Sequence, residues 1–524
     1  MSIAKAINSL RTDAHLTQEQ FADIFDVSQQ SVQKWEMGDS VPELNKLIKI
    51  SKYFGISLDA LILDNNDRNI EIEQNIKQLR PEYQVISMWE YYPTDLMVEY
   101  NQCVEEGLDI EQYKDVFASV ARLPKSEHKR ILGDALFNVV LNAKVREDYK
   151  YIEPNDLEKI KTLRKPYTYD KVKGADMESR IHGAWLGRTC GCMLGKTVEG
   201  IHTDIFIPFL KESGNYPLHR YIYRSDITDE ILNKYKFGFL TRPYADDIDC
   251  FPADDDMNYT VLYQELINKS GKGFNSNDVA TLWLNSQIKN AYCTAERVAF
   301  CNFVKGYAPP DSAIHKNPYR EWLGGQIRAD YFGYINPRNP SLAAEMAWRD
   351  ARISHVKNGI YGEMFVAAML AAAAETDNFE DIILAGLGEI PHTSRLYEEV
   401  MSVLDGYKKG VSKEDCFNTI HEKYDEYTAH GWCHTAPNAM IVAASLLYGN
   451  GDYAKSICMA VETCFDTDCN GATVGSIIGM AKGVEIIPEY WSKPINNKIE
   501  TTIFGVSTVN ITDRVKLTID HINR

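Results

Sequence analysis

Apolar residues along this chain recur mostly at spacings of three and four, the period of an amphipathic helix. One such segment carries Phe117, Val120 and Ala121 on one face, and a second spans residues 131–140. Other apolar segments are long and rich in Ala and Leu, and no clear run of alternating apolar and polar residues indicates a strand. The pattern therefore predicts an all-α fold.

Changes in this patterning divide the chain into three predicted domains. Residues 1–65 alternate short helical patterns with turn signals, and residues 69–168 form a helical middle region in which no chemical motif stands out. Residues 175–524 are dense in Gly and Ala and contain acidic clusters. The polar stretch at residues 65–68 is typical of a linker between the first two domains.

The first predicted domain contains two short helices joined by a tight turn. Thr17 and Gln20 have the spacing of a capping box that begins one helix, and Ser28 is the expected N-cap of the next. Val32 and Trp35 are three residues apart and are expected to face inward. The side chains that this arrangement leaves outside are Gln29, Gln30, Gln33 and Lys34.

Two helices joined in this way form a helix-turn-helix, and residues 7–61 resemble the Cro/repressor-type (XRE) helix-turn-helix family. The resemblance implies a five-helix domain in which Gln18 contacts the DNA backbone and the four outward side chains read bases. One short recognition helix reads few base pairs alone, so we expect a homodimer on double-stranded DNA. The alternative is a module for protein contact, because acidic residues outnumber basic ones in this domain.

The overall composition is that of a folded, acidic protein. The 56 Lys+Arg and 74 Asp+Glu give a formal net charge of −18, which argues against a surface that coats nucleic acid or anionic lipid. The first residues show no secretory signal, and the longest apolar run, residues 364–374, is too short to span a membrane. The 11 cysteines include no CxxC pair. We expect a cytoplasmic protein with free thiols and no membrane partner.

Glycine recurs at every fourth residue in two segments of the third domain. The two ridges are Gly183, Gly187, Gly191 and Gly195, and Gly471, Gly475, Gly479 and Gly483. Each Gly costs roughly 1 kcal/mol of helix propensity relative to Ala, so four on one helix face need a compensating cause. Close approach of helix backbones is such a cause. We therefore expect both helices at the centre of a compact bundle and near each other.

Acidic residues adjoin both ridges. Glu199 follows the first ridge, and Asp466 and Asp468 precede the second. A third cluster comprises Asp246, Asp247, Asp249, Asp254, Asp255 and Asp256. Its first three members are expected on a solvated surface, whereas the last three lead into an apolar helical run. Packed carboxylates repel one another unless they bind protons or cations, and oxygen ligands suit Mg²⁺, Mn²⁺ or Ca²⁺ rather than Zn²⁺.

Three motifs, in this order, resemble the ADP-ribosylglycohydrolase family over residues 178–490. They are RIHGAWLGRTCGCMLGKTVE, DDDMNYT and FDTDCNGATVGSIIG, and the segment GIYGEMFVAAMLAAAAE also looks like the family's central helix. The resemblance implies an all-α domain that holds two divalent ions, Mg²⁺ or Mn²⁺. The metal ligands that it implies are Asp254, Asp255, Asp256, Asp466, Asp468 and Cys469.

Within this implied ligand set, Asp255 and Asp256 form one pair, and Asp468 bridges the two ions. Asp254 stands where the family has a metal-binding Thr. Cys469 replaces a ligand Thr, and Cys192 replaces an acidic residue common in the first motif.

Chemistry and resemblance together predict a metal-dependent hydrolase that cleaves an ADP-ribosyl or similar N- or O-ribosyl bond, coupled to a sequence-specific DNA-binding module. Glu199 is the expected general acid/base. The alternative is a transcription regulator whose glycohydrolase-like domain only senses ADP-ribose or a related nucleotide. The DNA-reading module and Cys469 favour the sensor, whereas Glu199 and the aspartates favour the enzyme.

Overall fold

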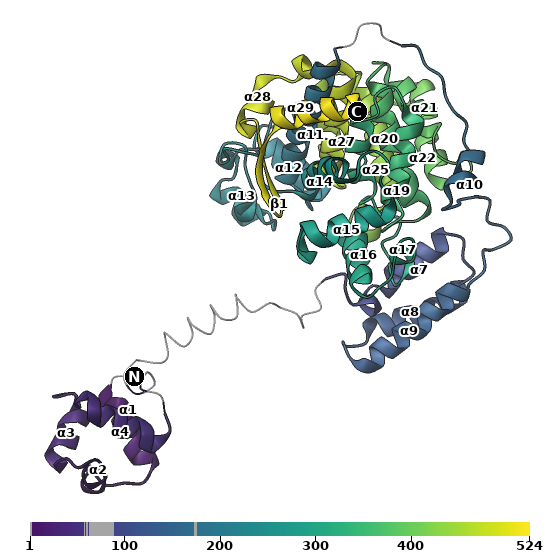
Figure 1. Cartoon of the computed structure of the whole chain (residues 1–524). Helices are drawn as coiled ribbons and strands as arrows, with labels where there is room; N and C mark the ends of the chain where they lie inside the picture. Colours follow the sequence, from purple (N-terminus) through teal and green to yellow (C-terminus); the bar gives the residue numbers. More distant parts are fainter. Residues whose placement is uncertain (1–2, 57, 59–60, 62–87, 172–175) are drawn as a thin grey trace. The chain divides into compact units, whose positions relative to one another are not determined.

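Figure 1 shows the computed structural model of the chain, which describes residues 3–56, 58, 61, 88–171 and 176–524. The described residues fall into two compact units, within Met1–Ile86 and within Ser87–Arg524. Both units are mostly helical, which confirms the predicted fold class. The predicted linker at residues 65–68 and most of the fifth helix expected in the first unit lie outside the described residues.

The first unit contains the two predicted helices and the turn between them. Its helices are α1 (Ile3–Asp13), α2 (Gln18–Phe25), α3 (Gln29–Met37) and α4 (Leu44–Phe54). Thr17 accepts a hydrogen bond from the Gln20 backbone N–H, and the Gln20 side chain accepts one from the Thr17 N–H, so the capping box is present. Ser28 caps α3, and Val32 and Trp35 are buried in the core, as predicted.

The second unit begins with a small helical region and continues into a larger domain. The region comprises α7 (Leu96–Glu105), α8 (Lys114–Arg122), α9 (Glu127–Asn142) and α10 (Leu157–Thr162). The domain begins with α11 (Met177–Lys196), α12 (Thr203–Glu212), α13 (Asp229–Lys234), α14 (Asp255–Ser270), α15 (Ser276–Ser286), α16 (Thr294–Val304), α17 (Asp311–Ile314), α18 (Asp330–Tyr334) and α19 (Pro340–Ala351). It continues with α20 (Lys357–Ala373), α21 (Phe379–Leu387), α22 (Arg395–Lys408), α23 (Lys413–Lys423), α24 (Ala429–Cys433), α25 (Thr435–Gly449), α26 (Tyr453–Glu462), α27 (Thr467–Lys482), α28 (Glu489–Ser492), β1 (Lys498–Ile503), β2 (Val506–Asn510) and α29 (Ile511–Asn523).

The two glycine ridges meet at the centre of the larger domain, as expected. Helices α11 and α27 run antiparallel, so that a Cβ placed on Gly191 would overlap the carbonyl oxygen of Gly471, and one on Gly187 that of Gly475. The fourth glycine of the second ridge differs from the prediction. Gly483 has a φ of 88° and ends α27, and Gly195 faces the first turn of α27 instead. The antiparallel seam brings the end of α11 to the start of α27.

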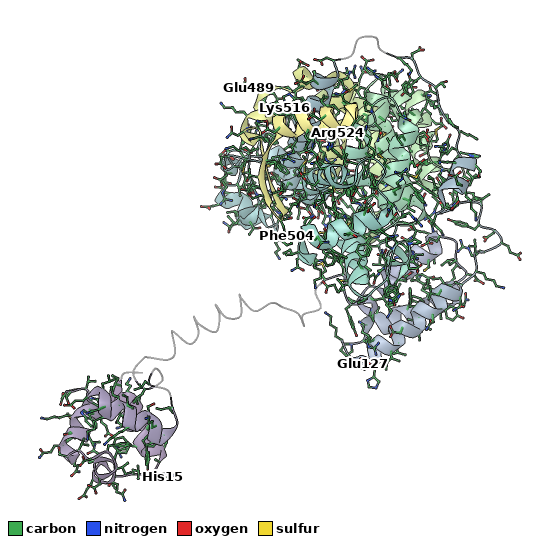
Figure 2. The ribbon with its side chains drawn as sticks, in the orientation of Figure 1. His15, Glu127, Glu489, Phe504, Lys516 and Arg524 are labelled. Atoms are coloured by element: carbon green, nitrogen blue, oxygen red, sulfur yellow. The ribbon has the colours of Figure 1, made fainter. Side chains whose placement is uncertain are left out.

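A β-hairpin holds the chain that leads into α14. β1 and β2 pair antiparallel, with a bulge between Glu500 and Ile503, and Figure 2 labels Phe504 in the connecting turn. The Phe251 N–H donates to the Lys498 carbonyl at 2.9 Å, and the Glu500 N–H donates to the Phe251 carbonyl at 2.9 Å. The sequence pattern missed this short hairpin. It fixes the backbone three residues before Asp254.

The region before the larger domain has a small core of its own. Phe117, Val120 and Leu136 are buried in it, whereas Ile131 and Leu132 are exposed despite their helical spacing. No helix among the described residues is both long and apolar enough to cross a membrane.

Candidate functional site

Most of the predicted metal ligands and Glu199 meet where α11 ends and where α14 and α27 begin. They border a pocket of about 140 Å³ whose lining includes Glu199, Asp255, Asp466, Asp468 and Cys469. Asp254 and Asp256 lie next to it and are buried, as are Asp466 and Asp468. By contrast, Asp246, Asp247 and Asp249 are exposed, as expected for a solvated surface. Residues more than 250 positions apart thus share one acidic site.

The donor atoms of this site form two overlapping groups. One group contains Cys192, Asp254, Asp256 and Asp468, and the other contains Asp466, Asp468 and Cys469. Within each group, one ligand atom per residue lies within 4.8 Å of the others, and Asp468 belongs to both. Oδ2 of Asp256 and Oδ1 of Asp468 have no hydrogen-bond partner among the described residues. Buried oxygens without a partner are uncommon and fit the binding of a cation.

Two cationic side chains of α11 reach the same aspartates. Arg188 donates to Asp256 Oδ1 at 2.8 Å and pairs with Asp330 at 2.8 Å, and all three side chains are fully buried. Lys196 Nζ lies 2.6 Å from Asp254 Oδ2, and the Cys192 thiol lies 3.4 Å from the other oxygen of Asp254. Both oxygens of Asp254 therefore have partners, whereas Asp256 and Asp468 each have one oxygen without a partner among the described residues.

Sequence reasoning missed these two cations and Asp330. The available signal was spacing, since Arg188, Cys192 and Lys196 are four residues apart and share the helix face beside the glycine ridge.

Burial and mutual repulsion disfavour ionisation of the aspartates. Burial raises the pKa of Asp256 to about 8, Arg188 opposes this rise, and Asp254 adds to it. Burial, with Glu199 and Asp466 nearby, raises the pKa of Asp468 well above its usual range. A bound cation would reverse these shifts, because it stabilises the ionised carboxylates.

Glu199 lies on the loop after α11 and has a side chain that is 41% exposed. Its backbone carbonyl accepts a hydrogen bond from Arg242 at 2.7 Å, and its carboxylate lies 3.8 Å from the same guanidinium. Although the side chain is partly exposed, the surrounding protein removes its carboxyl from much of the water, and this desolvation, followed by the charges of Asp466 and Asp254, raises the pKa of Glu199 to about 7 in the metal-free protein. A carboxyl with such a pKa can hold or release a proton near neutral pH.

The rest of the pocket wall is aromatic and thiol-rich. Its further lining includes Trp89, Trp322, Trp432, Cys293 and Cys433. None of these residues was predicted as part of the site. Trp89 comes from the segment before α7, far from the acidic motifs in the sequence.

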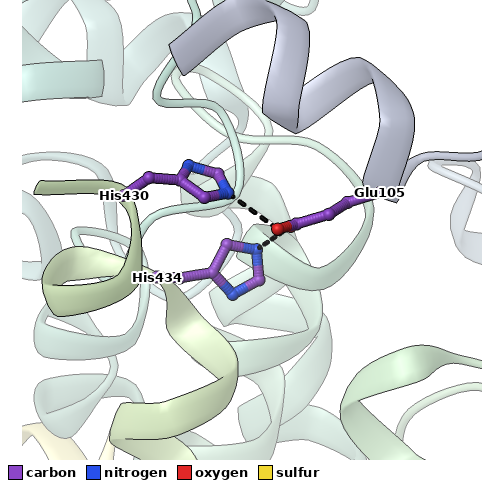
Figure 3. Close-up of side chains that lie close together, drawn as sticks. All are labelled: Glu105, His430 and His434. Carbon is purple, nitrogen blue, oxygen red and sulfur yellow. Dashed lines mark hydrogen bonds and ion pairs between the residues drawn. The ribbon is translucent and has the colours of Figure 1, made fainter. Parts of the chain in front are cut away.

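A second cluster of metal-ligand type lies at the end of α7 (Figure 3). Glu105 Oε1 lies 3.0 Å from His430 Nε2, and Oε2 lies 3.3 Å from His434 Nε2. The other nitrogen of each ring faces a group that can only donate: Trp322 Nε1–H at 3.2 Å for His430, and the Ala436 N–H at 3.1 Å for His434.

Each imidazole must therefore carry its proton on Nε2, so no lone pair there faces a metal. The cluster is therefore a contact between one carboxylate, that of Glu105, and the Nε2–H groups of two imidazoles. Burial opposes ionisation of Glu105, but His434, His430 and Arg395 together lower its pKa to about 2.

In the first unit, the predicted DNA-reading side chains lie outside the core. Gln29, Gln30, Gln33 and Lys34 are all exposed on α3. Gln18, at the start of α2, is partly buried and donates to Glu36 at 2.7 Å, and Glu36 also pairs with Arg11.

A family model described as ADP-ribosylglycohydrolase matches residues 173–517, more than half of the chain. The chain belongs to the ADP-ribosylglycohydrolase family. All the predicted metal ligands and Glu199 lie within this match, whereas Trp89 and Glu105 precede it. A separate helix-turn-helix model matches residues 7–61, which include the five predicted DNA-binding residues.

Individual proteins match parts of the chain. The HTH-type transcriptional activator BcrR of Enterococcus faecalis is 33% identical over 86 residues, which cover 16% of this chain and 42% of that protein. The chain thus matches less than half the length of this relative. A solved structure titled "ADP-ribosylglycohydrolase-related protein complex" is 16% identical with a TM-score of 0.40, and the likeness covers 66% of this chain and 98% of the other.

Proposed function

We propose that the chain is a metal-dependent hydrolase that cleaves an ADP-ribosyl N- or O-glycosidic bond and is coupled to sequence-specific DNA binding. The observation that carries the proposal is the convergence of Glu199 and the motif aspartates at one pocket, where a buried oxygen of Asp256 and one of Asp468 have no partner in the described part of the chain. Family membership supports the ligand class.

The donor set fits two divalent cations, Mg²⁺ or Mn²⁺. Asp254 and Asp256 would hold one ion, Asp466 and Cys469 the other, and Asp468 would contribute to both. Asp255, the expected partner of Asp256, is in neither donor group and lines the pocket instead, and Asp254 is also paired with Lys196. When bound, such cations fix ribose hydroxyls and polarise water. Because Cys192 and Cys469 each place a thiol in one donor group, the site also suits softer ions than a site of oxygen ligands alone would.

The reaction needs one group that moves a proton, and we assign this role to Glu199, which lines the pocket beside the motif aspartates. In its protonated form it would donate to the leaving nitrogen or oxygen as the ribosyl bond breaks. In its ionised form it would accept a proton from the attacking water. Arg242 would hold the Glu199 loop at the pocket.

For the first unit, we propose binding to double-stranded DNA as a homodimer. The side chains that would read bases are Gln29, Gln30, Gln33 and Lys34. Gln18 would contact the DNA backbone after breaking its hydrogen bond to Glu36. We also propose the domain boundaries 1–65, 69–168 and 175–524.

The second candidate function is a transcription regulator that binds an ADP-ribose-type ligand without cleaving it. The two thiols in the donor groups favour it, and so does the likeness to a transcriptional activator.

An assay of ADP-ribose release from an ADP-ribosylated protein tests the two candidates. We expect release with Mg²⁺ or Mn²⁺ and none with EDTA. Glu199→Gln should lose about 10²- to 10⁴-fold in rate while still binding ADP-ribose. Glu489→Gln, an exposed Glu on α28, is the matched control and should keep full activity. Binding of ADP-ribose without release by the unaltered chain would favour the regulator.

A further inference from the structure

Trp89 lines the candidate pocket although it lies outside the family match, which begins at residue 173. In the sequence, it stands between the helix-turn-helix match and α7. The family domain therefore does not form the pocket alone, because a side chain from the preceding segment completes its wall.

Several contacts hold Trp89 in this place. Its ring lies 5.0 Å from the guanidinium of Arg297, and it packs against a cluster that contains Trp322 and Val298. Trp322 lines the same pocket.

Helix α7, which follows Trp89, is anchored to the larger domain by buried charges. Arg320 pairs with Glu99 at 2.8 Å and with Glu106 at 2.6 Å, and Gln102 donates to Glu321 at 2.7 Å. The contact of Glu105 with His430 adds a further anchor, because His430 lies on α24, the helix that also carries the pocket residues Trp432 and Cys433. Breaking buried pairs of this kind is strongly destabilising, so α7 is a fixed part of the unit.

The pocket lining combines carboxylates, which bind hydroxyl groups, with indole rings, which pack against apolar ring faces. A volume of about 140 Å³ suits a ribosyl group rather than a whole sugar nucleotide. We propose that Trp89 is a ligand-binding residue that packs against the ribosyl end of an ADP-ribose-type ligand. The segment from Trp89 through α7 is then part of the binding site. This inference rests on the proposed ligand class but does not need catalysis.

The test uses fluorine NMR of the full chain labelled with 5-fluorotryptophan. Trp89→Phe and Trp348→Phe identify two of the eight tryptophan signals by their loss. Trp348 is a matched control, because it is also half-buried and lies 4.6 Å from an arginine, Arg352, but is not part of the pocket wall. With ADP-ribose and Mg²⁺, we expect the Trp89 signal to shift and the Trp348 signal to stay.

Calorimetric titration gives a second measurement. Trp89→Ala should bind ADP-ribose about five- to tenfold more weakly, a usual effect of removing an aromatic contact, and Trp348→Ala should bind as the unaltered chain does. Shifts at Trp322 or Trp432 without a shift at Trp89 would overturn the inference and leave the proposed function standing. No shift at any tryptophan and no heat of binding would overturn both. The NMR measurement decides the question even if Trp89→Ala does not fold.

Discussion

Replacing Gly191 with Ala tests the seam that assembles the site. Helix propensity alone would make the Ala variant about 1 kcal/mol more stable. However, the new Cβ would overlap the carbonyl oxygen of Gly471, a backbone atom that cannot rotate away as a side chain can. Overpacking costs typically about 1–3 kcal/mol, and a rigid neighbour puts this site at the upper end. The net loss expected in the free energy of unfolding is about 2 kcal/mol.

Gly406 on α22 provides the matched control. A Cβ there would meet Val411 at 3.7 Å, an ordinary contact, so Gly406→Ala should gain up to about 1 kcal/mol of helix propensity. Calorimetry of the full chain should show a lower melting temperature for Gly191→Ala and an equal or higher one for Gly406→Ala. If Gly191→Ala melts no earlier than the unaltered chain, the close approach of α11 and α27 is wrong.

Four further outcomes are expected. Mg²⁺ should raise the melting temperature of EDTA-treated protein, and Asp468→Ala should abolish this rise more completely than Asp466→Ala, which a thermal scan with and without the ion would show. Co²⁺ should produce near-ultraviolet sulfur-to-metal absorption that weakens in Cys469→Ser; an unchanged spectrum would exclude that thiol as a ligand. The raised pKa of Glu199 makes the folded state bind more protons than the unfolded state between about pH 4.5 and 7. Metal-free protein should therefore lose stability as the pH rises through this range. Melting curves at several pH values should show a smaller loss of stability for Glu199→Gln. ADP-ribose should change the affinity for a selected DNA site, and DNA should change the affinity for ADP-ribose by the same factor; equal DNA affinity with and without ligand would mean that the units are merely tethered.

Local patterns in the sequence predicted much of this architecture. The capping box of Thr17 and Gln20 and the inward spacing of Val32 and Trp35 depend on neighbours within one or two turns, so they could be derived without a structure. The glycine ridges were equally informative, because the propensity cost of four glycines on one helix face is compensated by close backbone contact, which α11 and α27 make.

Features that depend on distant partners could not be derived in this way. The hairpin at β1 is short, and Phe251, which lies far away in the sequence, is one of its backbone partners. The wall residue Trp89 has no motif around it and is placed by the anchoring of α7. Lys196 was visible as a charge, but its pairing with Asp254 depends on how α11 meets α14.

Charge balance explains why a measurement of cation binding alone would not distinguish the two candidate functions, a hydrolase and a ligand sensor. Arg188 and Lys196 face a larger number of buried aspartates, and Arg188 is shared with Asp330, so the acidic site needs bound protons or cations to balance its charge in either case. Glu199 differs from these aspartates, because it is partly exposed and lines the pocket without being needed to close a buried network. A sensor that only binds its ligand does not need a group that transfers a proton there, whereas a hydrolase does. The behaviour of Glu199→Gln, rather than metal dependence, therefore decides between the two functions.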